Sequence, residues 1–238
     1  MDNMKIFTRF GVLLFLALAS STASAIVVGF DEFDAGTIID DEYAAGPGPG
    51  GVFISAENFN NSLDVAVVFD TNNVTGGDVD LAAPFLLLNE VPLSPGNVLI
   101  IQENGPCSEL SCDVPDDEGG RPAGTFTLEF VAPVILESID FFDIEEEESM
   151  GSIRLFDSQG AMLPGMFAVP NTGGDNTWGR VTFSVTGVSR VEIDMGGSGA
   201  IDNITFSVVP VPAAAWLFGS GLGLLVVVRR RISRATAS

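Results

Sequence analysis

The chain has 238 residues, 18 Phe, 46% hydrophobic residues and a net charge of −22, a composition that excludes a wholly disordered protein. It has no His, so a Ser-His-Asp or Cys-His catalytic pair and a His-ligated metal site are excluded as well. Between Ile26 and Val209 four Arg face 31 acids, which gives 4 − 31 = −27 without a single Lys. Such a surface repels nucleic acid and favours cations.

Residues 1–25 have the pattern of a secretory signal peptide. A positive start, an apolar run and a small-x-small signal-peptidase site follow one another: Lys5 and Arg9, then Phe10–Ala19, then Ala23 and Ala25. The apolar run is shorter than the roughly 20 residues that a helix needs to cross a bilayer, which favours cleavage over a retained anchor. The mature chain is predicted to begin at Ile26.

Residues 26–207 are predicted to form one domain, because this length suits a single hydrophobic core. Short runs rich in Val, Ile, Phe and Thr alternate with Gly, Pro, Asn and Asp clusters, and no long helical period occurs. The candidate strands are Ile26–Phe30, Gly51–Ser55, Leu63–Phe69, Asn97–Gln102, Gly124–Val131, Val134–Ile144, Gly151–Phe156, Met166–Val169, Trp178–Val185, Ser189–Asp194 and Ala200–Val208. This spacing predicts a mostly β fold, a jelly-roll-like β-sandwich.

A polar loop, Asn104–Gly120, holds both cysteines. Cys107 and Cys112 lie close in a chain predicted to be exported, so a local disulfide is expected; a thiolate metal site would need further ligands. Two groups of acids are expected to lie in solvated loops, with cation binding as the alternative for the first: Asp113, Asp116, Asp117 and Glu118, and the run Glu145–Glu148 in a hairpin turn.

Two sets of acids are candidate Ca²⁺ ligands. Asp70, Asp78 and Asp80 bracket Gly76 and Gly77, whose flexibility allows a tight bend around one cation. The spacing is not that of an EF-hand, and a solvated turn is the alternative.

The second set rests on analogy with jelly-roll modules, in which the first and last strands often pair near a structural Ca²⁺. By that analogy Asp31 or Glu32 near the start of the domain meets Asp202 before the last strand.

Trp178 is the best candidate for stacking on a sugar, because Asn176, Thr177 and Arg180 supply polar groups beside it. A core position at a strand edge is the alternative. One Tyr and two Trp are few for a carbohydrate cleft. The chain is not expected to be an enzyme, although a glycosidase needs only two carboxylates.

Residues 208–238 form a candidate membrane tail. Val208–Val228 carries no charge, is long enough for one transmembrane helix and has Pro210 and Pro212 at its start. Arg229, Arg230 and Arg231 follow at once, and this basic cluster is expected to stay in the cytoplasm. The domain would then lie across the inner membrane.

The order Pro210-Val211-Pro212, glycine-bearing apolar span and Arg cluster resembles the PEP-CTERM sorting signal. Val211 stands where the name-giving motif has Glu. The resemblance implies recognition by an exosortase, removal of the tail, and export to the cell surface or extracellular matrix of a Gram-negative bacterium that makes exopolysaccharide. An ordinary anchor without processing is the alternative.

The segments Phe30–Ile39, Val68–Leu81, Asn97–Glu103 and Gly199–Ile204 also resemble ectodomains that precede such tails. The leading hypothesis is a non-catalytic surface or biofilm-matrix protein whose acidic domain binds cations and exopolysaccharide. A carbohydrate-binding module with a defined sugar ligand and a matrix polysaccharide hydrolase are the alternatives.

Overall fold

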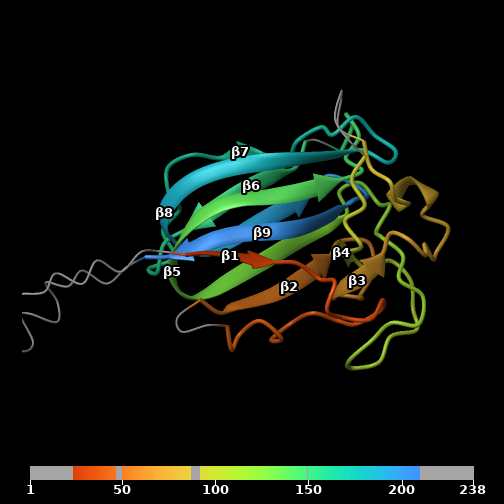
Figure 1. The fold of residues 1–238 in the computed structure, drawn as a ribbon, viewed down its shortest axis with the longest axis horizontal. Helices are drawn as coiled ribbons and strands as arrows, with labels where there is room; N and C mark the ends of the chain where they lie inside the picture. The colour runs from red at the N-terminus through yellow and green to blue at the C-terminus, as the bar shows by residue number, and fades with distance from the viewer. Residues whose placement is uncertain (1–23, 47–49, 87–91, 149, 210–238) are drawn as a thin grey trace, which may run out of the picture. The chain divides into compact units, whose positions relative to one another are not determined.

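The structure is a computed structural model that describes residues 24–46, 50–86, 92–148 and 150–209 (Figure 1). They belong to one compact unit, Ala23–Val209. Residues 1–23 of the predicted signal peptide and 210–238 of the predicted sorting tail lie outside the described residues, and with them Ala23, Pro210, Val211, Pro212, Arg229, Arg230 and Arg231, whereas Ala25 begins β1 and Val208 ends β9. Within the described part of the chain, no helix is long and apolar enough to span a membrane.

The described domain is mostly β, as predicted. Its elements are β1 Ala25–Val28, β2 Val52–Asn58, β3 Ala66–Asp70, the 3-10 turn η1 Val79–Leu81, β4 Asn97–Ile101, β5 Gly124–Phe142, β6 Ser152–Phe156, β7 Phe167–Ala168, β8 Trp178–Met195 and β9 Ala200–Val208. The last predicted strand, Ala200–Val208, is observed with the same bounds.

Two pairs of predicted strands are each a single long strand in the structure. Pro133 lies in β5 where its register with β8 shifts between Glu129 and Val134, and Gly187 lies in β8 with a φ of 83°. Proline and glycine are tolerated inside strands at such irregularities. These residues bend β5 and β8 without ending them.

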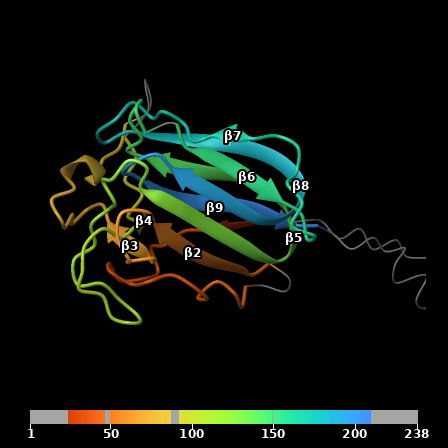
Figure 2. The same cartoon turned by 180° about the vertical axis from the view of Figure 1, so that it is seen from behind.

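All ladders between the named strands are antiparallel, and they form one nine-stranded sheet. Seven of the strands follow one another in the order β3-β4-β9-β5-β8-β6-β7, while β1 pairs with β9 and β2 with β5 beside this path. The start of β5 pairs with β2 and its end with β9, while β8 follows the other edge of β5. β1 pairs with β9, so the first strand lies beside the last (Figures 1 and 2). Segments far apart in sequence therefore meet at β9.

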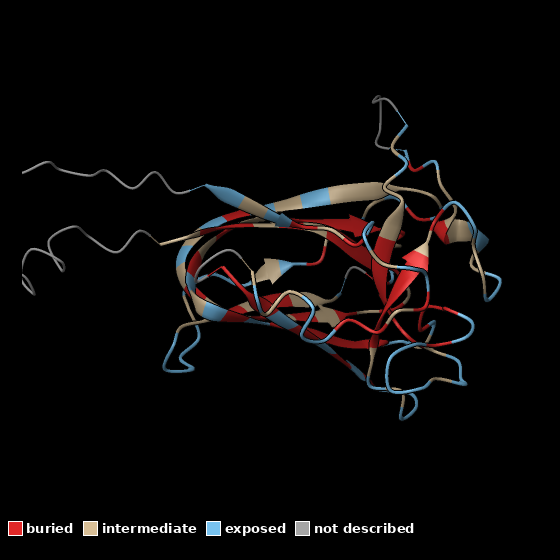
Figure 3. Cartoon of the chain, turned by 60° about the horizontal axis from the view of Figure 1, so that its bottom comes forward, coloured by how far each residue is buried: buried red, intermediate tan, exposed pale blue. Residues whose placement is uncertain are grey.

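The main core is formed by the inward-facing side chains of the strands. Phe126 and Leu128 of β5, Ile193 of β8 and Phe206 of β9 are fully buried in one cluster. Phe130 packs edge-on against Phe206 with ring centroids 4.8 Å apart. Figure 3 shows buried residues concentrated in the strands and exposed residues in the surrounding loops. Burial of these apolar side chains is the dominant stabilising contribution.

A second, smaller core covers the opposite face of β3 and β4. Alternation along β4 sends Leu99 to the main core and Val98 and Ile100 to the second one. Loop residues close over it: Leu81, Phe85, Cys112 and, partly buried, Trp178. The loops around η1 and the cysteines therefore form a packed layer.

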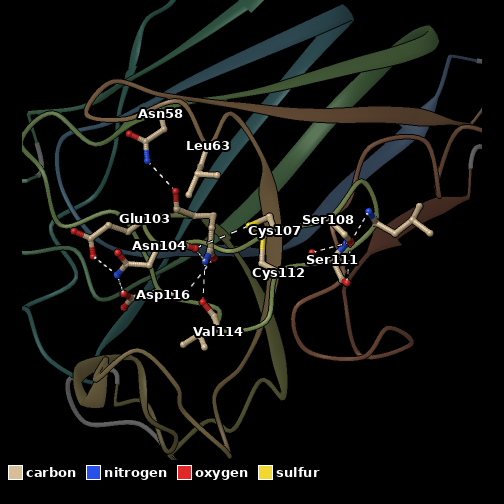
Figure 4. Close-up of a disulfide and its surroundings, with 12 residues drawn as sticks. Asn58, Leu63, Glu103, Asn104, Cys107, Ser108, Ser111, Cys112, Val114 and Asp116 are labelled. Carbon is tan, nitrogen blue, oxygen red and sulfur yellow. Dashed lines mark hydrogen bonds between the residues drawn. A yellow bond between two sulfur atoms is a disulfide. The ribbon is translucent and has the colours of Figure 1, made fainter.

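Gln102 clamps the cysteine loop from inside. Figure 4 shows this loop with its disulfide and labels Asn104, Val114 and Asp116, whose backbone groups bond to Gln102. Its side chain is fully buried, its Nε2 donates to the carbonyl oxygens of Asn104 at 2.5 Å and Val114 at 2.8 Å, and its Oε1 accepts the Asp116 N–H at 3.2 Å. The expected disulfide between Cys107 and Cys112 is present. The loop is thus held by the hydrogen bonds of Gln102 and by the disulfide.

This clamp corrects the prediction that the loop acids are solvated. Asp116, Asp117 and Glu118 are 6%, 6% and 3% exposed, and only Asp113 of that group is exposed. The predicted acidic turn is likewise only partly exposed, because Glu148 is buried and pairs with Arg121 at 3.1 Å. Packing of the loops onto the second core places these acids inside.

Candidate metal centres

The first candidate centre lies where β1 meets β9, and we call Asp31, Glu32 and Asp202 the junction cluster. The register Val28↔Ile204 brings the residues after β1 beside the start of β9. Asp202 is 3% exposed, and its Oδ1 has no hydrogen-bond partner. Gly29 lies against that oxygen, since a Cβ added to it would be 3.4 Å away, an ordinary van der Waals contact.

The charge of Asp202 is not neutralised by Arg180, which binds Asp140 instead. Asp140 is its cross-strand partner, and Arg180 binds Asp140 through two bonds of 2.5 and 2.7 Å. Among the described residues no ion pair involves Asp202. Burial, with smaller contributions from Asp140 and Asp31, raises its pKa from 3.8 to about 7. The folded domain therefore penalises the ionised form of this side chain.

The N-terminal acids of the junction cluster come from the segment that follows β1. Asp31 Oδ1 accepts the Asn97 N–H at 2.8 Å, which fixes it against the start of β4. Tyr43 donates its hydroxyl to the Gly29 carbonyl oxygen. Burial, and then the charge of Glu32, raises the pKa of Tyr43. Asp31 thus lies close enough to Asp202 to raise its pKa, and Glu32 and Asp202 both raise the pKa of Tyr43.

The second candidate centre is a loop cluster of four acids: Asp78, Asp80, Asp117 and Asp143. Asp78 and Asp80 lie on the turn that precedes and forms η1, where Gly76 and Gly77 have φ of 69° and 113°. The predicted grouping of these two acids with Asp70 is not what the structure assembles. Asp70 accepts the Asn72 N–H at 2.9 Å, which caps the turn after β3.

Asp117 and Asp143 take the place that the sequence suggested for Asp70. The Asp117 N–H donates to Asp78 Oδ2 at 3.1 Å, and the Gly199 N–H donates to Asp117 Oδ2 at 2.6 Å. Asp143 lies just after β5 with a φ of 56°, is 3% exposed and has an Oδ1 without a hydrogen-bond partner. Its positive φ is the one local signal, and it is not readable from sequence.

Asn176 holds η1 against the end of β5. Its Nδ2 donates to the carbonyl oxygens of Val79, Asp80 and Ala82 at 3.1, 2.9 and 2.6 Å. The next residue, Thr177, accepts the Asp143 N–H through its carbonyl oxygen at 2.9 Å. These bonds draw three distant segments of the chain to one place.

The loop cluster concentrates negative charge. Burial, with the charges of Asp116 and Asp80, raises the pKa of Asp78 to about 7. Burial, with Asp80 and Glu148, raises the pKa of Asp143 to about 7. The pKa of Asp117 is raised well above its ordinary value by burial and by Asp78. Buried carboxylates that raise one another's pKa are suited to bind a cation.

An exposed trio contrasts with these clusters. Within the described ranges, Asp40, Asp41 and Glu42 are the three acids whose carboxylate oxygens lie within 4.8 Å of one another. Local backbone bonds account for this, because the Asp40 N–H donates to Glu42 and the Asp41 N–H to Asp40. All three are exposed, so their proximity alone does not indicate a site.

Trp178 is not placed as a stacking platform. Its ring stacks on Phe142 with centroids 6.4 Å apart, and its indole Nε1 is buried without a hydrogen-bond partner. Arg180 lies 5.9 Å from the Trp178 ring and lines a shallow polar hollow of about 480 Å³ on β5, β8 and β9. The other residues of the hollow are Ile135, Glu137, Ser138, Thr182, Ser184 and Ser207.

No protein-family model matches the chain, and no curated protein matches it. Solved structures with a similar β arrangement include a Streptococcus pneumoniae fucose-binding module, 11% identical over 39% of this chain and 67% of that one, with a TM-score of 0.27. A family 29 carbohydrate-binding module is 12% identical over 79% of this chain and 90% of that one, with a TM-score of 0.31.

The enzymatically active domain of bacteriophage CBA120 tailspike protein 4 is 18% identical over 66% of this chain and 19% of that one, with a TM-score of 0.32. These likenesses are too distant to carry a function from any of the three proteins to this chain.

Proposed function

We propose that the chain is a non-catalytic protein of the cell surface or extracellular matrix, with a jelly-roll-like β-sandwich that binds Ca²⁺ at the junction cluster. Asp202 carries this proposal, because its buried Oδ1 lacks a partner beside two further acids. Ca²⁺ takes oxygen ligands, and carboxylates are among the ligands it prefers. Bound Ca²⁺ would tie the first strand to the last.

Export is proposed from the ends of the sequence. A signal peptidase would cut after Ala25, and an exosortase would recognise Pro210-Val211-Pro212 and remove the tail. Intact-mass analysis of the protein from an exosortase-bearing host tests this: the mature chain is expected to begin at Ile26 and to lack the Arg cluster. A mature chain that keeps Arg229–Arg231 would favour an ordinary anchor.

The calcium proposal is tested on the purified full-length chain in detergent. Melting is followed by circular dichroism in Ca²⁺ and then in EGTA. At a Ca²⁺ concentration of about 100 times Kd, binding contributes about 2.7 kcal/mol and raises Tm. A Tm that is the same in Ca²⁺ and EGTA would overturn the proposal. Retention on exopolysaccharide in the two buffers then tests matrix binding.

A second candidate function, glycan binding, is favoured by the polar hollow rather than by Trp178. Ser138, Thr182 and Arg180 offer hydrogen-bond donors and acceptors on one open surface. Thr182→Arg would fill the hollow from an exposed face and is expected to remove exopolysaccharide retention with an unchanged melt. Retention that survives this substitution would leave the hollow without a role in glycan binding.

A further inference from the structure

The loop cluster lies apart from the junction cluster and joins different segments. Asp78 and Asp80 belong to the turn at η1, Asp117 to the disulfide loop and Asp143 to the end of β5. The Gly199 N–H, from the turn before β9, adds a fourth segment through its bond to Asp117. Four connections that are separate in sequence therefore converge on one group of charges.

Nothing in the surrounding structure neutralises this group. Among the described residues, no ion pair involves any of the four acids. The nearby Arg121 is bound instead to Glu145 and Glu148 at 3.0 and 3.1 Å. A buried carboxylate without a counter-charge is costly, and a bound cation removes that cost.

Asp143 supplies an observation independent of the clustering. It is 3% exposed, its Oδ1 has no hydrogen-bond partner, and its backbone is held in the left-handed region by the Thr177 carbonyl. The large majority of buried side-chain polar atoms in folded proteins have a hydrogen-bond partner. The missing partner of this oxygen indicates a ligand.

We propose that the loop cluster binds a hard divalent cation, with Ca²⁺ as the ion, and thereby locks the loop layer onto the second core. The oxygens of its acids are further apart than those of the exposed trio, so binding draws the Asp78 and Asp80 side chains toward Asp143. Gly76 and Gly77 give that turn the freedom to adjust. This inference does not depend on calcium at the junction cluster.

Terbium luminescence separates the two sites, because each has its own aromatic donor. The chain has one Tyr, Tyr43 beside the junction cluster, and two Trp. Trp178 follows Thr177, whose carbonyl oxygen accepts the Asp143 N–H, so it adjoins the loop cluster. The other tryptophan, Trp216, is replaced by Trp216→Phe in the full-length chain so that it cannot contribute to the emission. Excitation at the red edge, where only tryptophan absorbs, is expected to give Tb³⁺ emission that Ca²⁺ displaces.

Asp143→Asn is expected to raise the apparent Kd for this Tb³⁺ emission at least about tenfold, which is about 1.4 kcal/mol. Asp78→Asn, which keeps a side-chain oxygen to accept the Asp117 N–H, is expected to do the same. Asp175→Asn, an exposed acid near Asp143, is the matched control and should leave the Kd within about twofold.

Absence of tryptophan-sensitised emission, or emission unaffected by Asp143→Asn, would overturn the inference. Tryptophan also absorbs where tyrosine does, so the part of the emission that Tyr43→Phe removes reports the junction cluster separately. Asp202→Asn should remove the Tyr43 signal and leave the Trp178 signal intact. That result would show that the junction cluster and the loop cluster bind Tb³⁺ independently.

Discussion

Replacing Asp202 by Asn tests the junction cluster most sharply, because stability and calcium response should change in opposite directions. The pKa of Asp202 is about 7 in the folded domain against 3.8 ordinarily, a difference that corresponds to on the order of 4 kcal/mol. Without a cation this is a cost of folding, absent below the ordinary pKa, growing as pH rises and complete above about pH 7. Asn is nearly isosteric and carries no charge.

In EGTA at pH 8, Asp202→Asn is therefore expected to raise Tm by up to roughly 16 °C, at 2–4 °C per kcal/mol for a domain of this size. In Ca²⁺ the variant should show no further rise from this site, while the wild type does. Thermal melts by circular dichroism measure both effects. Glu109→Gln, at an exposed acid, is the control and should move neither melt. A variant that melts below the wild type in EGTA and keeps the full calcium shift would refute the reasoning.

Four further predictions follow from other parts of the structure. In EGTA, the wild-type free energy of unfolding should fall as pH rises from about 4 to about 7, since the raised carboxyl pKa values, such as that of Asp202, mean that the folded state holds more protons than the unfolded state. Chemical denaturation at a series of pH values measures this, and a free energy of unfolding that does not fall over that range would contradict it. Gln102→Leu should cost about 2–3 kcal/mol by orphaning buried backbone groups, and a urea midpoint equal to wild type would contradict the clamp. Gly199→Ala should destabilise the domain by at least about 1 kcal/mol, because φ is 124° and the new Cβ would lie 2.5 Å from the Ile144 side chain, whereas Gly119→Ala, in open space, should be neutral in the same assay. Trp178→Ala should lower the free energy of unfolding by about 3 kcal/mol through lost packing on Phe142, and lost glycan retention with an unchanged melt would instead favour a sugar site.

The sequence predicts most of the strands because alternation and turn residues are local signals. Ala200–Val208 is recovered with its bounds, and Cys107 and Cys112 pair as their proximity suggests. The sequence predicts two strands in place of β5 and two in place of β8, and the gaps fall at Pro133 and Gly187, because a bulge and a chain reversal use the same residue types. Only pairing with a continuous neighbouring strand distinguishes the two.

For the acids too, some properties follow from the sequence and others from the packing. Composition alone places a large negative charge on the domain and predicts affinity for cations, since charge depends on residue type. The meeting of Asp31 with Asp202 follows from the pairing of the first and last strands. Which acids lose their water is decided by long-range packing.

Only the tertiary structure shows that Asp70 caps a turn. It also brings Asp117 and Asp143 to the loop cluster, beside Asp78. The second core buries these loops, and the desolvation that raises their carboxyl pKa values exists only once distant segments have closed over them. Charge was therefore determined by the sequence, whereas burial, and with it the candidate metal centres, depends on how the chain packs.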